Sequence, residues 1–392
     1  MSSAFTESEE RQELRKQVAR LAGKYGREWF TEKARAGEKT TDLWLEIGKN
    51  GYLGINIPEE YGGGGGDIGD IAAVCEELAA QGCPLLLMVV SPAICGTIIS
   101  RYGTDEQKQR WLPGICDGTG TMAFAITEPD AGTNSHNITT TARKDGDGWV
   151  LNGRKIYISG VDEADNVLVV ARTEALSPTG ERTGKLKPCL FVVPTDAEGF
   201  EAKPIPMEIV SPELQFQVFI DDVRLPADAL VGDEDGGLVQ LFAGLNPERI
   251  MAASFSTGLA RFALGRAAAY AKERTVFKDA IGSHQAIAHP LAQSHIEIEL
   301  ARLMTQKAAA LYDAGDDMGA GEAANMAKYA AAEAACEAAD RAVQTHGGNG
   351  ITQEYGMAGL LVATRAGRIA PVSREMILNF VAMHSLGLPK SY

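Results

Sequence analysis

A short triplet, Pro247-Glu248-Arg249, interrupts an otherwise apolar stretch of the chain. Because GLVQLFAG precedes it and SFSTGLARFALG follows it, Glu248 would bring a carboxylate into apolar surroundings. Such surroundings raise a carboxyl pKa towards neutral pH, which suits the group to a chemical role. Two purely structural roles are also possible: Asn246 and Pro247 suit a helix N-cap and first turn, or Pro247 kinks one long helix.

Two stretches in the middle of the chain combine turn residues, hydroxyls and an aromatic side chain. In MAFAITEPDAGTN, an apolar run leads into a turn whose N–H groups and Thr133 hydroxyl could bind phosphate or carbonyl oxygens. In NGRKIYISG, Tyr157 and Ser159 alternate on one face of a predicted strand, where they could stack on and hydrogen-bond to a flat ring system. Each stretch alone is also explained as an ordinary turn or strand.

Two later stretches are suited to the other end of such a ligand. In KERTVFKDAIGSHQ, Arg274, Phe277 and Gln285 could clamp a diphosphate and an adenine. In QTHGGNG, Gln344 stands just before glycines that let a ligand approach the backbone. The structural alternative is that Gly347 simply ends the preceding alanine-rich helix.

Motifs of other reaction classes are missing from the sequence. His284 and His289 have no acidic partner nearby in the chain, so HEXXH-type metal chemistry is not indicated and we expect no metal site. There is no GxSxG nucleophile elbow. The six cysteines show no CxxC spacing and lie mostly in apolar surroundings, which indicates buried free thiols in a reducing compartment.

Length and charge limit the class of protein further. A chain of 392 residues is too long for one simple core. Its net charge of −15 argues against nucleic-acid binding, which needs a basic face, although a few arginines and lysines can still hold a small anion. The N-terminus, MSSAFTESEERQELRKQ, is unlike a signal or transit peptide, and no apolar run reaches about 18 residues. We therefore expect a soluble cytoplasmic protein without a membrane span.

The middle of the chain carries the signals of a β domain. Asp147-Gly148 and Asn152-Gly153 predict hairpin turns, and LQFQVFI alternates as a half-buried strand does. Helices are predicted on both sides; for example, Thr104 caps a helix at DEQKQRWLPGI. Since no βαβ alternation occurs, a Rossmann fold is not expected.

The predicted order of elements is therefore helical, then β, then helical. We expect an α+β multidomain protein with a helical domain over 1–120, a β domain over 121–235 and a helical domain over 236–392.

Together and in this order, these stretches resemble the acyl-CoA dehydrogenase family along essentially the whole chain. The matching stretches are PEEYGG, YGTDEQKQRWLPGI, AFAITEPDAGTN, NGRKIYIS, ERTVF and QTHGGNGI. The resemblance implies an N-terminal α-helical domain, a central β-barrel-like domain and a C-terminal four-helix bundle. It also implies FAD as cofactor, an acyl-CoA substrate, a homotetramer, and an electron-transfer flavoprotein as electron acceptor.

The resemblance also implies roles for individual residues. Tyr157 and Ser159 match the aromatic and hydroxyl positions beside the isoalloxazine, where the family more often has Trp and Thr. The flavin-facing loop, whose last member here also faces the substrate, would comprise Phe124, Ile126, Thr127, Gly132 and Thr133. The FAD contacts supplied by a neighbouring subunit would comprise Arg274, Phe277, Gln285, Gln344, Gly347 and Gly348.

The sequence departs from the commonest family pattern at the base. Many members carry the catalytic Glu in a YEGT-like segment near the C-terminus, but RIAPVSREMILN has Ala370 there, and Glu375 is more than a helical turn away. Similarity to the isovaleryl-CoA and long-chain branches, which carry the Glu in an LDLER-like segment of the first long C-terminal helix, implies Glu248 as base. The Ala370 N–H could still donate to the thioester oxygen. Asn246 and Arg249 match positions near the CoA moiety, although a structural ion pair would also explain Arg249.

The expected reaction is α,β-dehydrogenation of a short-to-medium or branched acyl-CoA to the trans-2-enoyl-CoA. Glu248 would take the α-proton, and the β-hydrogen would leave as hydride to flavin N5. Two alternative functions are compatible with the same residues. One is an acyl-CoA oxidase or other flavin enzyme of the same fold, and the second is a FAD-binding, non-catalytic partner subunit in which Ala370 marks lost activity.

Overall fold

The N-terminal part of the protein is a group of packed helices. The structure, a computed structural model, describes residues 7–176, 182–234 and 236–390. The N-terminal helices are α1 (Glu9–Ala22), α2 (Gly26–Ala36), α3 (Thr41–Lys49), α4 (Ile68–Ala80), η2 (Val89–Gly96), α5 (Thr97–Tyr102) and α6 (Asp105–Asp117). As expected, Thr104 caps α6: its hydroxyl accepts from the Gln107 N–H while the Gln107 side chain accepts from the Thr104 N–H.

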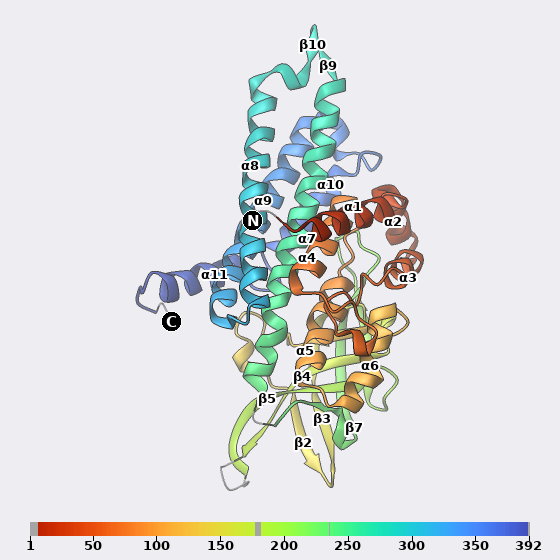
Figure 1. Cartoon of the computed structure of the whole chain (residues 1–392), viewed down its shortest axis with the longest axis vertical. Coiled ribbons are helices and arrows are strands. Elements are labelled where there is room, and N and C mark those ends of the chain that lie inside the picture. Colours follow the sequence, from red (N-terminus) through yellow and green to blue (C-terminus); the bar gives the residue numbers. More distant parts are fainter. Residues whose placement is uncertain (1–6, 177–181, 235, 391–392) are drawn as a thin grey trace.

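The central part is a single mixed sheet that forms the lower end of the molecule in Figure 1. Its main path runs in the order β6-β7-β3-β2-β4-β5-β8, and β1 pairs in parallel with β4. The strands are β1 (Met122–Ala125), β2 (Thr141–Asp145), β3 (Gly148–Ser159), β4 (Asn166–Leu176), β5 (Arg182–Pro194), β6 (Phe200–Ile205), β7 (Gln215–Leu225) and β8 (Leu230–Val231). Within the described ranges no ladder joins β6 to β8, so the expected β domain is an open sheet and not a closed barrel.

Of the two hairpin turns predicted in this sheet, one is wrong. β2 and β3 pair around the turn at Gly146 and Asp147, as expected. Asn152 and Gly153 instead lie inside β3, where the pairing with β7 shifts register. Gly153 is needed there because an added Cβ would lie 2.3 Å from the Thr140 hydroxyl. The glycine therefore serves a bulge and close packing, and the chain does not turn at it.

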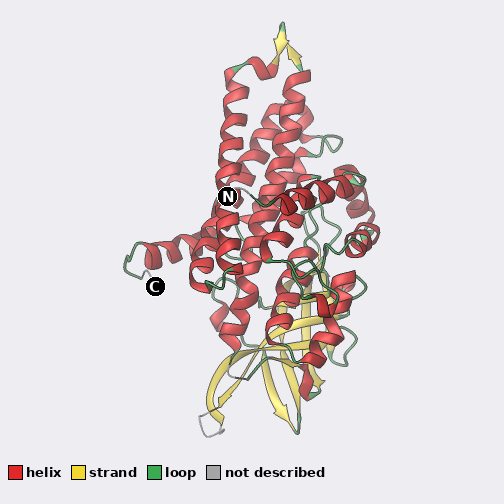
Figure 2. Ribbon diagram, viewed as in Figure 1, coloured by secondary structure: helices red, strands yellow, loops and turns green. Residues whose placement is uncertain are grey.

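The C-terminal part is a helical bundle that forms the long upper half of the molecule (Figures 1 and 2). Helices α7, α8, α9 and α10 pack against one another, and alanines line much of the α9 interface. A short hairpin of β9 and β10 joins α7 to α8 at the far end (Figure 1). The elements are α7 (Gly237–Glu273), β9 (Thr275–Val276), β10 (Asp279–Ala280), α8 (Gln285–Asp313), α9 (Asp317–His346), α10 (Met357–Gly367) and α11 (Arg374–Phe380).

Helix α7 continues without interruption through Pro247. The interpretation of Asn246 as an N-cap is therefore wrong, and Pro247 lies inside one long helix. Proline has no N–H, so the carbonyl four residues earlier, that of Ala243, loses its intrahelical donor. The Tyr312 hydroxyl of α8 donates to that carbonyl oxygen at 2.9 Å. A side chain from the neighbouring helix thus replaces the missing backbone bond, and Glu248 lies mid-helix.

Helix α7 is fixed against the N-terminal helices by close packing and by buried charges. At Gly258 an added Cβ would lie 2.4 Å from the Glu76 carbonyl oxygen of α4, so only glycine permits this approach. Nearby, Arg261 of α7 donates to the carboxylates of Glu76 and Glu77 at 2.7 Å, and Arg15 of α1 donates to both at 2.9 Å. These contacts hold α7 against the N-terminal helices.

Candidate active site

Glu248 is partly buried on α7 and carries a perturbed carboxyl group. Burial raises its pKa to about 7, while the positive charges of Arg249 and Lys328 act in the opposite direction. No hydrogen bond or ion pair joins Glu248 to another described residue, which leaves its carboxylate free to accept a proton. A carboxyl group with a pKa near neutrality, without a fixed partner, suits a general base.

Cys95 of η2 connects Glu248 with the start of the sheet. Burial, and then the charge of Glu248, raise the pKa of the Cys95 thiol. The thiol donates to the Ala123 carbonyl of β1 at 3.6 Å. The carboxylate on α7 and the strand that leads into the predicted flavin loop are therefore both neighbours of one buried side chain.

Arg249 and Asn246 form a small polar group beside Glu248. The Arg249 guanidinium donates to the Leu245 carbonyl at 3.0 Å and to the Asn246 side-chain oxygen at 3.4 Å. Its Nε is buried without a hydrogen-bond partner in the described structure. The Asn246 amide in turn donates to the Asp317 carbonyl of α9 at 3.3 Å. A buried donor without an acceptor costs free energy. A polar group of a bound ligand could supply the missing acceptor next to the carboxylate.

The segment around Ala370 joins α10 to α11 and rests on α9. The Ala370 N–H donates to the Ala366 carbonyl at 2.9 Å, so its donation to a thioester oxygen would require that bond to open. Lys328 of α9 donates from its Nζ to the Val372 carbonyl. Glu333, one turn further along α9, pairs with Arg368 at 2.7 Å and with Arg374 at 3.2 Å. The segment is thus anchored on α9 from both sides.

The predicted flavin loop follows β1 and is held by a buried ion pair. Lys155 of β3 pairs with Glu128 at 2.9 Å and also donates to the Ile126 carbonyl at 3.0 Å. Glu128 accepts as well from the backbone of Thr139 and Thr140. Burial works against this carboxylate, but the Lys155 charge and these hydrogen bonds outweigh it and lower its pKa to about 2. Of the predicted loop positions, Phe124 is buried, Ile126 and Thr127 are partly exposed, and Gly132 and Thr133 are exposed.

Tyr157 and Ser159 lie on β3 immediately after Lys155. Pairing with β7 shifts between Lys155 and Ile158, and Tyr157 adopts a φ of 59°, which is unusual for a residue other than glycine. This bulge leaves the tyrosine side chain 58% exposed. Ser159 exchanges hydrogen bonds with Gln215 of β7 at 2.9 to 3.1 Å. The exposed ring is available for stacking, whereas Ser159 already has a partner.

The second predicted FAD-binding group lies away from the sheet. Arg274, Phe277 and Gln285 flank the β9–β10 hairpin (Figure 1), and Gln344, Gly347 and Gly348 lie where α9 ends. Phe277 is 97% exposed, and an added Cβ at Gly347 or Gly348 would meet nothing within 4 Å. The remaining members, Arg274, Gln285 and Gln344, are also exposed. This group is therefore separate from the flavin loop, which follows β1 of the sheet.

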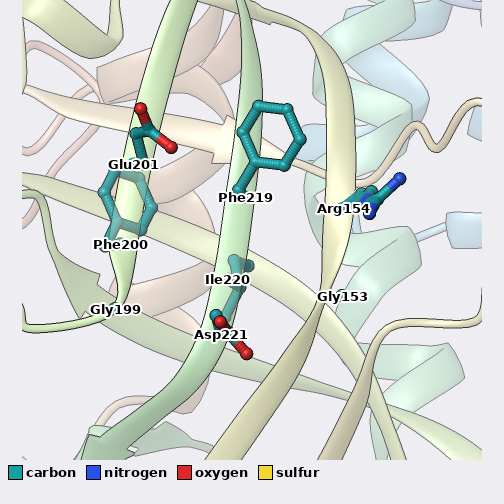
Figure 3. Close-up of a pocket in the computed structure, with 8 residues that line it drawn as sticks. All are labelled: Gly153, Arg154, Gly199, Phe200, Glu201, Phe219, Ile220 and Asp221. Carbon is teal, nitrogen blue, oxygen red and sulfur yellow. The ribbon is translucent and has the colours of Figure 1, made fainter.

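A depression on the surface of the sheet is not part of this site. It has a volume of ≈ 590 Å³ and lies on the sheet, over β3, β6 and β7 (Figure 3). Arg154, Phe200, Glu201 and Phe219 line it, and none of the predicted site residues does. Among the described residues, no helix is long and apolar enough to cross a membrane.

The fold and this site define a flavoprotein dehydrogenase built from helical, β and helical parts. The chain matches the N-terminal, middle and C-terminal domains of acyl-CoA dehydrogenases over residues 8–119, 123–219 and 235–386. It is 65% identical to acyl-CoA dehydrogenase FadE12 of Mycobacterium tuberculosis over 390 residues, covering 100% of this chain and 99% of that one. The chain belongs to the acyl-CoA dehydrogenase family and is an oxidoreductase that acts on acyl-CoA.

Two further relatives extend this similarity. The chain is 34% identical to the mitochondrial long-chain specific acyl-CoA dehydrogenase of Sus scrofa, over 89% of this chain and 80% of that one. A glutaryl-CoA dehydrogenase from Mycobacterium smegmatis in complex with FADH2 superposes with a TM-score of 0.89 at 26% identity, covering 100% of this chain and 98% of that one.

FAD is the cofactor of this enzyme, and the residues present fit it. The outward-facing ring of Tyr157 and the exposed ring of Phe277 offer two surfaces for planar groups. Open space over Gly132, Gly347 and Gly348 lets a ligand approach the backbone closely.

Sequence reasoning missed three functional candidates near the site. Cys95, Lys328 and the Glu128–Lys155 pair act through contacts between segments far apart in the chain. Only Lys328 carried a visible signal: it is a single cation among small apolar residues of α9 in the stretch MAKYAAA. Buried lysines need a partner, so such a lysine indicates a specific contact.

Proposed function

We propose that Glu248 is the base that removes the α-proton of an acyl-CoA thioester, giving the trans-2-enoyl-CoA. The α C–H bond breaks, its proton moves to a Glu248 carboxylate oxygen, and its electron pair forms the Cα–Cβ double bond as the β-hydrogen leaves as hydride. Bound FAD supplies the hydride acceptor at N5. The observation that carries the proposal is a carboxylate without a hydrogen-bond partner, whose pKa is raised by burial to about 7.

The alternative base fits the reaction less well. Glu375 lies in the first turn of α11, where its side chain is 72% exposed and pairs with Arg374 at 3.5 Å. Such a carboxylate stays hydrated and has no enclosed site in which to meet an acyl chain. Ala370 has no carboxylate at all. We therefore assign this chain to the branch of the family whose base lies on the first long helix of the C-terminal domain.

The FAD site in this proposal is shared between subunits of a homotetramer. Phe124, Ile126, Thr127, Gly132, Thr133, Tyr157 and Ser159 would bind the flavin end. Arg274, Phe277, Gln285, Gln344, Gly347 and Gly348 of a neighbouring subunit would bind the other end, because the two groups lie at opposite ends of one chain. Asn246, Arg249 and Thr133 would contact the substrate. Ala370 would add its N–H only after release from Ala366.

Electrons would pass to an electron-transfer flavoprotein, and the domains would divide as 1–120, 121–235 and 236–392. A cytoplasmic location is supported by six cysteines that are all buried and free, as expected of a reducing compartment.

Anaerobic mixing with a panel of acyl-CoAs tests the function and names the substrate class. Butyryl-, octanoyl-, palmitoyl- and isovaleryl-CoA would each be added to the purified yellow enzyme while flavin absorbance is followed. At least one should bleach the wild-type flavin, whereas Glu248→Gln should lose about 10²–10⁴-fold in rate and keep its flavin. Near-normal bleaching by Glu248→Gln would overturn the base assignment. Rapid reoxidation of the reduced enzyme in air with bound product would indicate an oxidase. If none of the acyl-CoAs bleaches the flavin, the protein is a non-catalytic subunit.

A further inference from the structure

Lys328 is a buried lysine of α9, the helix that packs against α7. Only 1% of its surface is exposed, and its neighbours along the helix, Ala324, Ala327, Ala331 and Ala332, are buried small residues. Removing an ammonium group from water is costly unless acceptors and opposite charges replace the water. Burial and then the charge of Arg249 lower the Lys328 pKa to about 8, while Glu248, Glu333 and Glu375 oppose this. A lysine held in such a position has a specific task.

Lys328 is linked to both parts of the site, to one by a hydrogen bond and to the other by its charge. Its Nζ donates to the Val372 carbonyl, two residues after Ala370 in the segment that joins α10 to α11. Its charge also acts on Glu248 across the gap between α9 and α7, although no direct ion pair joins the two side chains. Lys328 therefore holds the Ala370–Val372 segment by a hydrogen bond, and its charge acts on Glu248 from another helix.

Lys328 differs from the other charged and titratable groups around Glu248. Arg249 is the next residue on the same helix, and it faces Asn246 and the Leu245 carbonyl. Cys95 approaches from η2, but burial keeps its thiol protonated. Of the groups that act on the Glu248 pKa, Lys328 is the cation supplied by another helix. Glu333 and Glu375 act on Lys328 but not on Glu248.

We propose that Lys328 is a positioning residue for proton abstraction, which anchors the Ala370–Val372 segment to α9 and stabilises the ionised form of Glu248. The inference rests on the proposed role of Glu248 and assigns the residue that sets its working pH. The ionised base is the form that accepts the α-proton, so a nearby positive charge keeps more of the enzyme competent at neutral pH. The charge acts at a distance, and the carboxylate therefore stays free for the substrate.

Two neutral variants separate the charge from the anchoring contact. Lys328→Met removes both, whereas Lys328→Gln removes the charge and keeps a side-chain N–H donor. The measurement is the pH profile of kcat/KM for flavin bleaching, with whichever acyl-CoA of the panel reacts fastest with wild-type enzyme. Lys307→Met is the matched control, since Lys307 is exposed on α8 and the change in net charge is the same.

In both Lys328 variants the acid limb of the profile should shift to higher pH by about one pH unit. At pH 7 this corresponds to about a fivefold loss of kcat/KM, which should largely disappear by pH 9. Lys328→Met should also lower the alkaline plateau, because its Ala370–Val372 segment is released, while Lys307→Met should match wild type. An acid limb at the wild-type position in both folded variants would overturn the inference.

The remaining outcomes are also decisive. If both neutral variants lose folding and flavin while Lys307→Met keeps them, the role of Lys328 is structural and the inference fails. If Glu248→Gln is inactive and the Lys328 limbs do not move, only the Lys328 inference fails. If Glu248→Gln bleaches normally, the proposed function itself fails.

Discussion

Tyr312 supplies the hydrogen bond that Pro247 cannot make. Its hydroxyl donates at 2.9 Å to the Ala243 carbonyl, the acceptor four residues before the proline. The hydroxyl lies on α8 and the proline on α7, so this bond between two helices maintains the turn that carries Glu248. Burial raises the pKa of Tyr312 above its usual range and keeps it protonated as a donor. The turn of α7 that carries Glu248 therefore depends on a residue that lies 69 positions after that carbonyl in the chain.

Replacing this hydroxyl should destabilise the protein measurably. Tyr312→Phe leaves the buried Ala243 carbonyl without a donor, which should cost about 1 to 3 kcal/mol in the free energy of unfolding. Denaturant unfolding followed by circular dichroism would measure the loss. Tyr329→Phe is the control, because Tyr329 lies partly buried on α9 and its hydroxyl makes no hydrogen bond in the described structure. Equal stabilities of the two variants would contradict the role given to Tyr312.

Glu248 should make the protein less stable as the pH rises. Its folded-state pKa of about 7 lies above the ordinary value of 4.5, so the folded protein holds this proton more tightly than the unfolded chain. The resulting stabilisation is complete below about pH 4.5 and is lost as the pH rises through about 7. Glu248→Gln, a neutral mimic of the protonated acid, should gain about 2 to 3 kcal/mol relative to wild type between pH 5 and pH 8. Denaturant unfolding of both proteins at the two pH values would test this, and a constant difference would refute it.

Local patterns predicted local structure well. Thr104 caps a helix in the structure as the sequence predicted. The alternation in LQFQVFI gives β7, with Phe216, Val218 and Ile220 buried on one side. The motif order also indicated the family. In each case the decisive interaction lies within a few residues of the signal.

The failures share one physical cause, which is that a distant segment overrides a local preference. Asn246-Pro247 has the features of a helix start, but packing and the Tyr312 bond let α7 continue through it. Asn152-Gly153 has the features of a turn, but the close approach of Thr140 demands glycine inside a strand. Lys328 could not be linked to Glu248 before α9 and α7 were known to pack. Contacts between distant segments of this kind cannot be predicted from local motifs in the sequence.

The buried ion pair of Glu128 and Lys155 should be required for flavin retention. Lys155→Met would leave the Glu128 carboxylate buried without its counter-charge and free the Ile126 carbonyl, at a cost of about 3 to 5 kcal/mol. The loop after β1 should then lose its position next to Tyr157, and the purified protein should contain less flavin per chain. Absorbance at 450 nm relative to 280 nm and the thermal midpoint would both fall. Lys185→Met, at an exposed position on β5, should change neither. Unchanged flavin content in folded Lys155→Met would contradict this role.

Phe277 should affect flavin binding without affecting the fold of a single chain. Its side chain is 97% exposed, so Phe277→Ala should change the unfolding free energy of the apoprotein by less than about 0.5 kcal/mol. If the ring stacks on the FAD of a neighbouring subunit, flavin affinity should fall by about tenfold or more. Val276→Ala, next to it in the hairpin, is the control, and fluorescence titration of apoprotein with FAD is the measurement.

Subunit mixing would then show whether the two ends of the site come from different chains. Thr133→Ala damages the flavin loop, and Phe277→Ala damages the hairpin end. If each FAD site combines the loop of one subunit with the hairpin of another, hybrids contain some sites with an intact loop and an intact hairpin. Unfolding and refolding the two variants together should therefore restore tight FAD binding at a fraction of sites, whereas each variant refolded alone should show none. Failure of the mixture to exceed the average of the two variants would place both ends of the site in one chain and refute the shared site.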